Sequence, residues 1–415
     1  MKLRGFQKLT LTDQALQSWL AALQIGATKA AVVSLQDAPG RVLAEDVIAK
    51  EDLPRFDKSA MDGYALKSAD TVGASQFKPA AFQLTENHEV ADKQAKQVWT
   101  GNPIPMGADA VVMLENTKKR EGKLEVWSQL APGDNVSKKG EDTKKGDVAA
   151  KAGTRLNPYH IGLAAALGYS KLKVAEKPKI AILATGNELA EVGTQLSGNL
   201  IYDSNKIMLL AMCTELGAET TDYGIAKDNV DEIADKIRKA LQTQDAVITT
   251  GGTSVGGLDL VPDAVNKLGK PGVIVHGVAL RPAMPTALAM LQGKPVLVLS
   301  GNPVAAIVGF EVFGRPMVCR LLGMGKTEPR PMLKATLARR VASALGRKTY
   351  IRVCVTLKGG EFYAEPVSAK GSGSISTMTQ SNGFVIVPEN REGISEGETV
   401  VVHLFSGLEV ADQNV

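Results

Sequence analysis

The stretch TTGGTSVGGLDL, residues 249–260, directly follows Asp245-Ala-Val-Ile248, a run typical of the end of a buried strand. Glycine permits positive φ and close approach, so the amides and hydroxyls of 250–257 can form a concave nest for a phosphate or a similar oxyanion. The stretch is neither a Walker A motif nor a dinucleotide fingerprint. A tight strand-to-helix turn that merely needs glycine is the alternative interpretation.

The surrounding region, 177–328, alternates apolar runs of strand length with helical patterns. The predicted strands are 180–184, 246–250, 273–275 and 295–299. The predicted helices are 205–216, 230–241, 261–268 and a long helix from about 303 past 320. This alternation predicts a parallel sheet covered on both faces, with ligands at the carboxyl ends of the strands.

Two acids fall at that edge of the predicted sheet. Asp259 follows the glycine stretch, and Glu188 follows the first strand in Ala184-Thr-Gly-Asn-Glu188. An acid beside a phosphate cradle repels the ligand unless Mg²⁺ lies between them, so the pair predicts a magnesium site. Glu188 can equally be a first-turn acid at a helix N-terminus. Asp228 and Asp203 are interpreted as helix N-caps.

The flanking regions have other patterns. Residues 10–24 carry apolar residues at helical spacing, 34–153 breaks into short β-type runs, and the chain returns to β-type runs after Pro331. Lysines at 138–139 and 144–145 surround Gly140-Glu-Asp142 and are typical of a solvated loop.

Composition excludes several classes of protein. The net charge of +4, from 48 basic and 44 acidic residues, predicts a mixed surface and no nucleic-acid partner. Three well-separated cysteines give no disulfide framework or zinc spacing, and no apolar stretch has the length of a membrane span or signal peptide. We therefore expect a cytoplasmic protein with no membrane partner. The four histidines show no metal-ligand spacing and are interpreted as surface or packing residues, and no serine-hydrolase elbow occurs.

Six short motifs occur in one order along most of the chain, which makes chance an unlikely explanation. They are PRFDKSAMDGYA (54–65), GED (140–142), TGNEL (185–189), YDSN (202–205), GGTSVGGLD (251–259) and GNPV (301–304). Together they resemble the molybdopterin molybdenumtransferase family, MoeA and the E domain of gephyrin.

The resemblance implies an elongated, multi-region chain of the α/β plus β class that forms a homodimer. Its expected regions are an N-terminal helix (1–33) that packs on a linking region (34–50 and 146–176), a β-rich lobe (51–145), a MogA-like three-layer α/β molybdopterin-binding domain (177–328) and a C-terminal small β-barrel (329–415). The active crevice is expected between the α/β domain of one subunit and the lobes of its partner.

The resemblance also implies the reaction, in which molybdate is inserted into adenylated molybdopterin with Mg²⁺ and AMP is released. The adenylating MogA-like protein is an expected partner. Carried over by position, the catalytic acids are Asp62, Asp142, Glu188 and Asp259, of which Glu188 and Asp259 are the metal ligands, and Asp228 matches a further acid of the α/β domain. The expected substrate-binding residues are Thr250, Gly251, Gly252, Ser254, Gly256, Arg281, Pro303, Arg352 and Ser372.

The chain departs from the family pattern near the expected anion site. Where many members have KPGKP, this chain has Arg281-Pro-Ala-Met-Pro285, so one lysine becomes arginine and the other becomes Met284. Ser300 and Ala305 also differ from the common residues. Two alternatives stay open: a non-catalytic, gephyrin-like scaffold, which would fit a lost lysine, and an enzyme that inserts tungstate, which would use the same residues.

Overall fold

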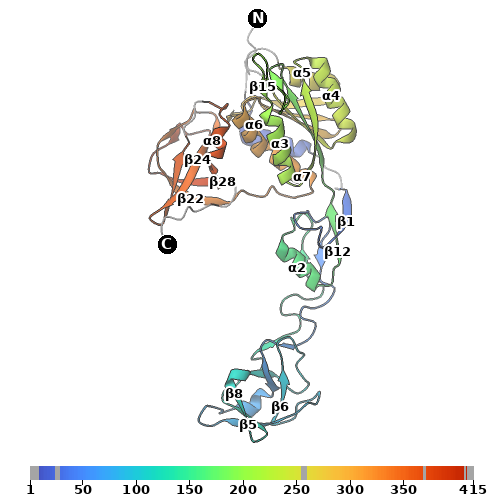
Figure 1. Ribbon diagram of the computed structural model, residues 1–415, viewed down its shortest axis with the longest axis vertical. Helices are drawn as coiled ribbons and strands as arrows, with labels where there is room; N and C mark the ends of the chain where they lie inside the picture. Colours follow the sequence, from blue (N-terminus) through green and yellow to red (C-terminus); the bar gives the residue numbers. More distant parts are fainter. Residues whose placement is uncertain (1–8, 24–28, 254–258, 368–370, 406–407, 409–415) are drawn as a thin grey trace. The chain divides into compact units, whose positions relative to one another are not determined.

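The computed structural model describes residues 9–23, 29–253, 259–367, 371–405 and 408. These residues form two compact units, one built from Met1–Ala31 and Ala175–Val415 and the other from Val32–Val174. Figure 1 colours the chain from the N-terminus to the C-terminus. Among the described helices, none combines the length and the apolar character that crossing a membrane requires.

A six-stranded sheet forms the centre of the α/β domain in the first unit. Its order is β16 (Glu219–Ala226), β13 (Lys179–Thr185), β17 (Ala246–Thr250), β21 (Lys294–Leu299), β20 (Ala287–Leu291) and β18 (Pro271–His276). The first four strands are parallel, as predicted, but β20 pairs antiparallel with both neighbours. The prediction of a purely parallel sheet is therefore wrong at this edge. Strand β20 was not predicted from the sequence, because its residues, ALAML, include none of the β-branched residues that are typical of strands.

Helices cover both faces of this sheet (Figure 1). They are α3 (Ser204–Glu215), α4 (Val230–Thr243), α5 (Leu260–Leu268) and a continuous run of α6 (Pro303–Gly309), the π-helix Phe310–Gly314 and α7 (Arg315–Leu321). The four helices predicted for 177–328 are confirmed, and each begins within two residues of its predicted first residue. Fully buried Val247, Ile233 and Val265 belong to the core between the sheet and the pair α4 and α5.

The C-terminal domain is a closed five-stranded barrel, as expected from the resemblance. The ring runs β24 (Lys348–Lys358), β25 (Glu361–Pro366), β22 (Met332–Leu337), β28 (Thr399–Leu404) and β26 (Gly383–Val387), and β26 closes it by pairing with β24. Its core holds Leu337, Val353 and Val402. A short strand of the α/β domain, β19 (Leu280–Arg281), pairs in parallel with β24, so the two domains share main-chain hydrogen bonds.

The second unit, Val32–Val174, is rich in short strands. Its six-stranded sheet has the order β7 (Ala110–Met113), β4 (Gly63–Leu66), β6 (Gln94–Val98), β5 (Ala80–Leu84), β9 (Lys123–Val126) and β8 (Thr117–Arg120). The unit also contains the helix α2 (Pro158–Ala166) and three two-stranded pairs: β3 (Lys58–Ser59) with β10 (Val136–Ser137), β2 (Val47–Ile48) with β11 (Val148–Ala150), and most of β1 (Ala30–Ser34) with β12 (Lys171–Ala175).

Helix α1 (Thr12–Ala22) packs against the α/β domain and not, as expected, on the linking region. The Thr12 hydroxyl donates to the carbonyl of Ala279 at 3.0 Å, and Trp19 Nε1 donates to the carbonyl of Phe313 in the π-helix at 3.2 Å. The face of α1 that carries Ala15 and Trp19 is fully buried in these contacts. The amphipathic pattern correctly predicts the helix, but such a pattern does not specify the surface that covers it.

Replacing Trp19 with Phe is expected to lower the free energy of unfolding by about 1–2 kcal/mol, because a buried hydrogen bond is lost and a small cavity forms. Urea unfolding followed by circular dichroism measures the change. Trp99, which is 51% exposed, is the matched control, and Trp99→Phe is expected to stay within about 0.5 kcal/mol of the parent. Equal effects of the two substitutions would contradict the packing of α1.

Candidate functional site

The first two glycines of the opening stretch are required by local geometry. Gly251 has φ +92°, and a Cβ there would lie 2.3 Å from the carbonyl oxygen of Thr185. Gly252 has φ +62°, and its Cβ would lie 2.7 Å from the Thr185 hydroxyl. The geometry of the turn alone thus accounts for both glycines. For Gly251 and Gly252 this supports the interpretation of the stretch as a tight strand-to-helix turn. Ser254 and Gly256 lie outside the described residues, so the anion nest stays a prediction.

A cavity of about 350 Å³ lies at the carboxyl ends of β13 and β17, and we call it the strand-end cavity. Four residues predicted for the site line it: Glu188, Thr250, Gly251 and Pro303. The Glu188 carboxylate folds back over the backbone, since a Cβ on Gly186 would lie 2.7 Å from Oε1. The motifs TGNEL, GGTSVGGLD and GNPV therefore meet at one edge of the sheet, and for the first two this was predicted from strand order.

Asn205 organises this cavity, a role that the sequence analysis missed. Its Nδ2 donates to the Thr250 hydroxyl at 3.0 Å and to the carbonyl of Gly301 at 2.7 Å. The side chain is buried and joins the ends of β17 and β21. Asp203 does cap α3, as predicted, by accepting from the amide of Lys206. The motif YDSN contains Asn205, but within it the sequence analysis gave a structural role only to Asp203, as a cap.

A buried lysine lies beneath the strand-end cavity. Lys206 is fully buried, and its Nζ lies 2.8 Å from Glu191, 3.0 Å from Asp222 and 3.9 Å from Asp203. Burial opposes its charge, but the hydrogen bonds with Glu191 and Asp222 outweigh burial and raise the pKa of Lys206. Burial raises the pKa of Asp203, whose contact with the ammonium group is the longest of the three. The cluster fixes α3, and with it Asn205, against the sheet.

Asp259 lies just before α5 and does not cap this helix. Its carboxylate is about one quarter exposed, and Oδ1 lies 3.7 Å from Nε2 of His276. Oδ1 has no hydrogen-bond partner among the described residues. His276 ends β18, which runs in the same direction as β21 because two antiparallel pairings separate them. The interpretation of His276 as a surface or packing residue overlooked its place at the carboxyl edge of the sheet.

The prediction that Asp228 caps a helix is wrong. Asn229 caps α4 instead, by accepting from the amides of Asp231 and Glu232. It stands directly before Val230, the first residue of the helix, where its side-chain oxygen reaches those amides. Asp228 instead accepts from the amide of Asn187 at 3.1 Å, and Asn187 accepts from the amide of Asp228 at 3.2 Å. This reciprocal pair links the loop that carries Glu188 to the end of β16.

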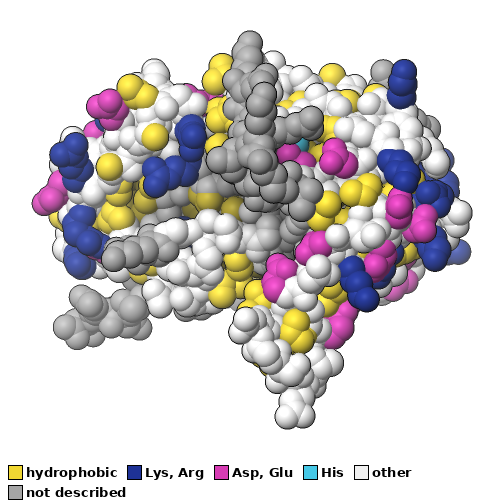
Figure 2. Space-filling view, turned by 90° about the horizontal axis from the view of Figure 1, so that it is seen from above, with side chains coloured by type: hydrophobic (Ala, Val, Ile, Leu, Met, Phe, Trp, Pro, Cys, Tyr) yellow, Lys and Arg dark blue, Asp and Glu magenta, His cyan; other side chains and the backbone are white. Residues whose placement is uncertain are grey.

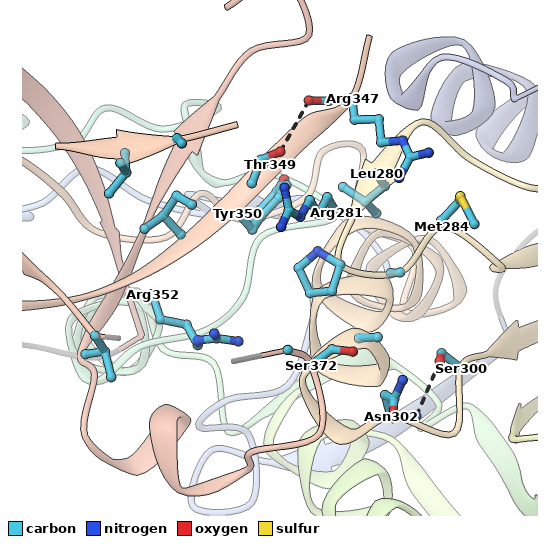
Figure 3. A pocket seen from close by; sticks show the side chains of 18 of the residues that line it. Leu280, Arg281, Met284, Ser300, Asn302, Arg347, Thr349, Tyr350, Arg352 and Ser372 are labelled. Carbon is cyan, nitrogen blue, oxygen red and sulfur yellow. Dashed lines mark hydrogen bonds between the residues drawn. The ribbon is translucent and has the colours of Figure 1, made fainter. Parts of the chain in front are cut away.

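A larger cavity, of about 720 Å³, lies between the α/β domain and the barrel (Figure 3), and we call it the arginine cavity. Its lining includes Arg281, Arg339, Arg340, Arg347 and Arg352 and contains no Asp or Glu among the described residues. Burial lowers the pKa of Arg352, and its Nε has no hydrogen-bond partner in the described part of the chain. In Figure 3 the Arg352 guanidinium points toward Ser372. Such a lining favours a bound anion.

The two cavities adjoin. Asn302 lines both of them, and the amide of Val304 donates to the carbonyl of Ser372 at 3.0 Å. Ser372 lines the arginine cavity and Gly373 the strand-end cavity. Arg281, Arg352 and Ser372 thus lie next to the group formed by Glu188, Thr250, Gly251 and Pro303.

The remaining two predicted acids, Asp62 and Asp142, belong to the second unit. Asp62 Oδ1 accepts from the amide and the hydroxyl of Thr100, both at 2.8 Å, and these hydrogen bonds lower the pKa of Asp62. The amide of Asp142 donates to the carbonyl of Leu53. The neighbouring lysines behave as a charged loop: Lys138 pairs with Asp57, and Lys139 with Asp52.

Charge is mixed on the surface as well. On the face shown in Figure 2, acidic side chains lie among the basic ones. Across the described ranges, no group of three or more His, Cys, Asp and Glu side chains is arranged to hold a metal ion. A cation at this site would therefore depend on fewer protein ligands.

Comparison with known families covers most of the chain. Residues 10–168 match the MoeA N-terminal region (domains I and II), 181–320 match the probable molybdopterin binding domain, and 334–405 match the MoeA C-terminal region (domain IV).

Individual relatives agree. A putative molybdopterin biosynthesis protein of Methanocaldococcus jannaschii is 39% identical over 90% of this chain and 92% of its own length. A molybdopterin molybdenumtransferase of Staphylococcus aureus is 37% identical over 90% of this chain and 91% of its own. The crystal structure of a molybdopterin biosynthesis MoeA protein from Pyrococcus horikoshii has a TM-score of 0.83 at 31% identity, covering 96% of this chain and all of that one. From the matched regions, the relatives and the shared fold together, we conclude that this chain belongs to the MoeA family.

Proposed function

We propose that this chain is a molybdopterin molybdenumtransferase, which inserts molybdate into adenylated molybdopterin and releases AMP. The observation that carries the proposal is the arginine cavity, with five guanidinium groups and no carboxylate in its described lining, next to the strand-end cavity. The reaction brings together two anions, a tetrahedral oxyanion and an adenylated pterin phosphate. Two adjoining cavities of this kind suit such a pair of substrates.

The proposed roles follow from the two cavities. Arg281, Arg352 and Ser372 bind the oxyanion, because a guanidinium offers paired donors that match the oxygens of a tetrahedral anion. Thr250, Gly251, Gly252 and Pro303, with Ser254 and Gly256 of the glycine stretch, bind the pterin adenylate. Asn205 positions Thr250 through its hydrogen bond.

Mg²⁺ belongs to the proposal with Asp259 and Glu188 as its protein ligands. Asp259 suits this role because its Oδ1 is buried and accepts no hydrogen bond from the described residues. Mg²⁺ commonly takes only one or two carboxylates and completes its shell with water and substrate phosphate, so no larger cluster is needed. When bound, the ion would neutralise charge on the phosphate that leaves as AMP.

We propose a homodimer in which the second unit of the partner subunit contributes Asp62 and Asp142 to the site. Light scattering of the full chain at micromolar concentration is expected to give twice the chain mass of 43.8 kDa. A purely monomeric mass would contradict this, and with it the assignment of Asp62 and Asp259 to one crevice. The MogA-like adenylating protein is the proposed supplier of the pterin adenylate.

Arg281→Ala is expected to weaken molybdate binding about tenfold, because a charge-assisted hydrogen bond contributes about 1.5–3 kcal/mol and the exposed Arg281 falls at the lower end. Titration calorimetry with molybdate measures the change. Arg320→Ala is a control of the same chemistry on α7, outside the cavity, and is expected to leave the affinity unchanged. An unaltered dissociation constant in Arg281→Ala would count against the oxyanion site.

A further inference from the structure

The arginines of the arginine cavity differ in how their charge is compensated. Arg339 forms an ion pair with Glu365 and donates to the carbonyl of Pro366. Arg281, Arg340, Arg347 and Arg352 have no carboxylate partner among the described residues, and of these only Arg347 and Arg352 are partly buried. An uncompensated, partly buried guanidinium is unfavourable until an anion binds to it. Arg347 and Arg352 are therefore the side chains that gain most from a bound anion.

Arg347 is held at this place by the backbone on both sides. The amide of Gly346 donates to the carbonyl of Glu389 at 2.7 Å, and the amide of Lys348 donates to the carbonyl of Ala279 at 2.9 Å. Lys348 itself pairs with Asp13 at 2.6 Å and lies 3.8 Å from Glu389. The nearby acids thus compensate Lys348 and leave Arg347 without a partner.

The ladder between the two domains brings the backbone segments that carry Arg347 and Arg281 close together. Strands β19 and β24 are parallel, and their register places Arg281 opposite Thr349. Arg347 lies in the bend just before β24, two residues from Thr349, so the ladder places its backbone near that of Arg281. The two guanidinium groups come from different domains, but the ladder fixes the backbones that carry them.

Met284 lies in the same cavity, in the turn that follows Arg281. A thioether carries no charge and is at most a weak acceptor, so it gives an oxyanion no cationic partner. In Figure 3, Arg347 extends past Arg281 toward the side of the cavity on which Met284 lies. In the described lining of this cavity, Arg281 is the cation from the α/β domain, and the barrel supplies Arg347 on the side of Met284.

We propose that Arg347 is a further oxyanion-binding residue, which supplies from the barrel the positive charge that Met284 does not supply from the α/β domain. The inference rests on the proposed function for the identity of the anion. The inference goes beyond the proposed function because it assigns oxyanion binding to Arg347. It also explains how the cavity can bind an anion with methionine at position 284.

The test is titration calorimetry of the full-length protein with molybdate and with tungstate, without pterin. Arg347→Gln is expected to weaken oxyanion binding at least about tenfold, the effect of losing one charge-assisted hydrogen bond. Arg320→Gln removes the same charge from α7, outside the cavity, and is expected to change the affinity less than about twofold, which excludes a general effect of net charge. Thermal unfolding of each variant checks that the fold is retained.

A rescue experiment keeps the test independent of folding defects. Met284→Lys in the Arg347→Gln background is expected to restore most of the lost affinity, because the charge returns from the other domain. Unchanged oxyanion affinity in Arg347→Gln would overturn the inference while leaving the proposed function intact. The same holds if the lysine fails to restore affinity in a folded double variant. A parent protein with no affinity for either oxyanion would overturn both the inference and the proposed oxyanion site.

Discussion

Asp259→Asn is expected to lower molybdate-driven AMP release by about a hundredfold or more. The amide keeps the size of the side chain but removes the charge that would hold Mg²⁺, and a bound metal contributes several kcal/mol of stabilisation to the developing phosphate charge. Binding of adenylated molybdopterin is expected to stay close to that of the parent, because the anion cradle is unchanged. Single-turnover AMP release and equilibrium binding of the adenylate measure the two quantities separately.

A matched control lies in the same helix. Asp263 is an exposed acid in the first turn of α5, and Asp263→Asn is expected to leave AMP release within about twofold of the parent. AMP release at the parent rate in Asp259→Asn would contradict the metal role. Equal losses of adenylate binding and turnover would instead assign Asp259 to substrate binding.

Lys206→Met is expected to lower the free energy of unfolding by about 2–3 kcal/mol. Removing the ammonium group leaves Asp203 buried without its cation, and Glu191 and Asp222 lose theirs. A broken, fully buried ion pair typically costs about 3–5 kcal/mol, but Glu191 and Asp222 are about half exposed and can regain water. Urea unfolding measures the change.

The control for this substitution is Lys267→Met. Lys267 pairs with Asp231 on the surface, with both side chains more than half exposed, so its loss is expected to cost less than about 1 kcal/mol. Lys206→Met is also expected to weaken adenylate binding, because α3 carries Asn205 to the strand-end cavity. A stability equal to that of the parent would show that the cluster does not hold α3 in place.

The sequence predicts those parts of the fold that depend on local pattern. The run 246–250 is β17, and the helices after it begin within two residues of their predicted starts because apolar spacing and end signals agree there. Strand β20 was missed, since an alanine-rich segment shows no strand preference until its neighbours bury it. The surface that covers α1 was predicted wrongly for a related reason: periodicity identifies the buried face but not the partner.

The candidate site shows the same division. Glu188, Thr250 and Gly251 could be placed together because they lie at the ends of β13 and β17, at one edge of the sheet, whereas Pro303 was assigned from the resemblance. Asn205, His276 and Arg347 could not be placed in this way, because the role of each depends on the contacts that form only after folding. Arg347 in particular becomes significant only when Lys348 has taken the nearby carboxylates and β24 has paired with β19.

The most direct measurement of the central claim is AMP release from adenylated molybdopterin by the purified, full-length protein, with and without molybdate. The account predicts stoichiometric AMP release that requires both molybdate and Mg²⁺, with tungstate compared in parallel to define oxyanion preference. A protein that binds the adenylate but releases no AMP with either oxyanion would contradict the account and favour a scaffold that has kept the fold without the reaction.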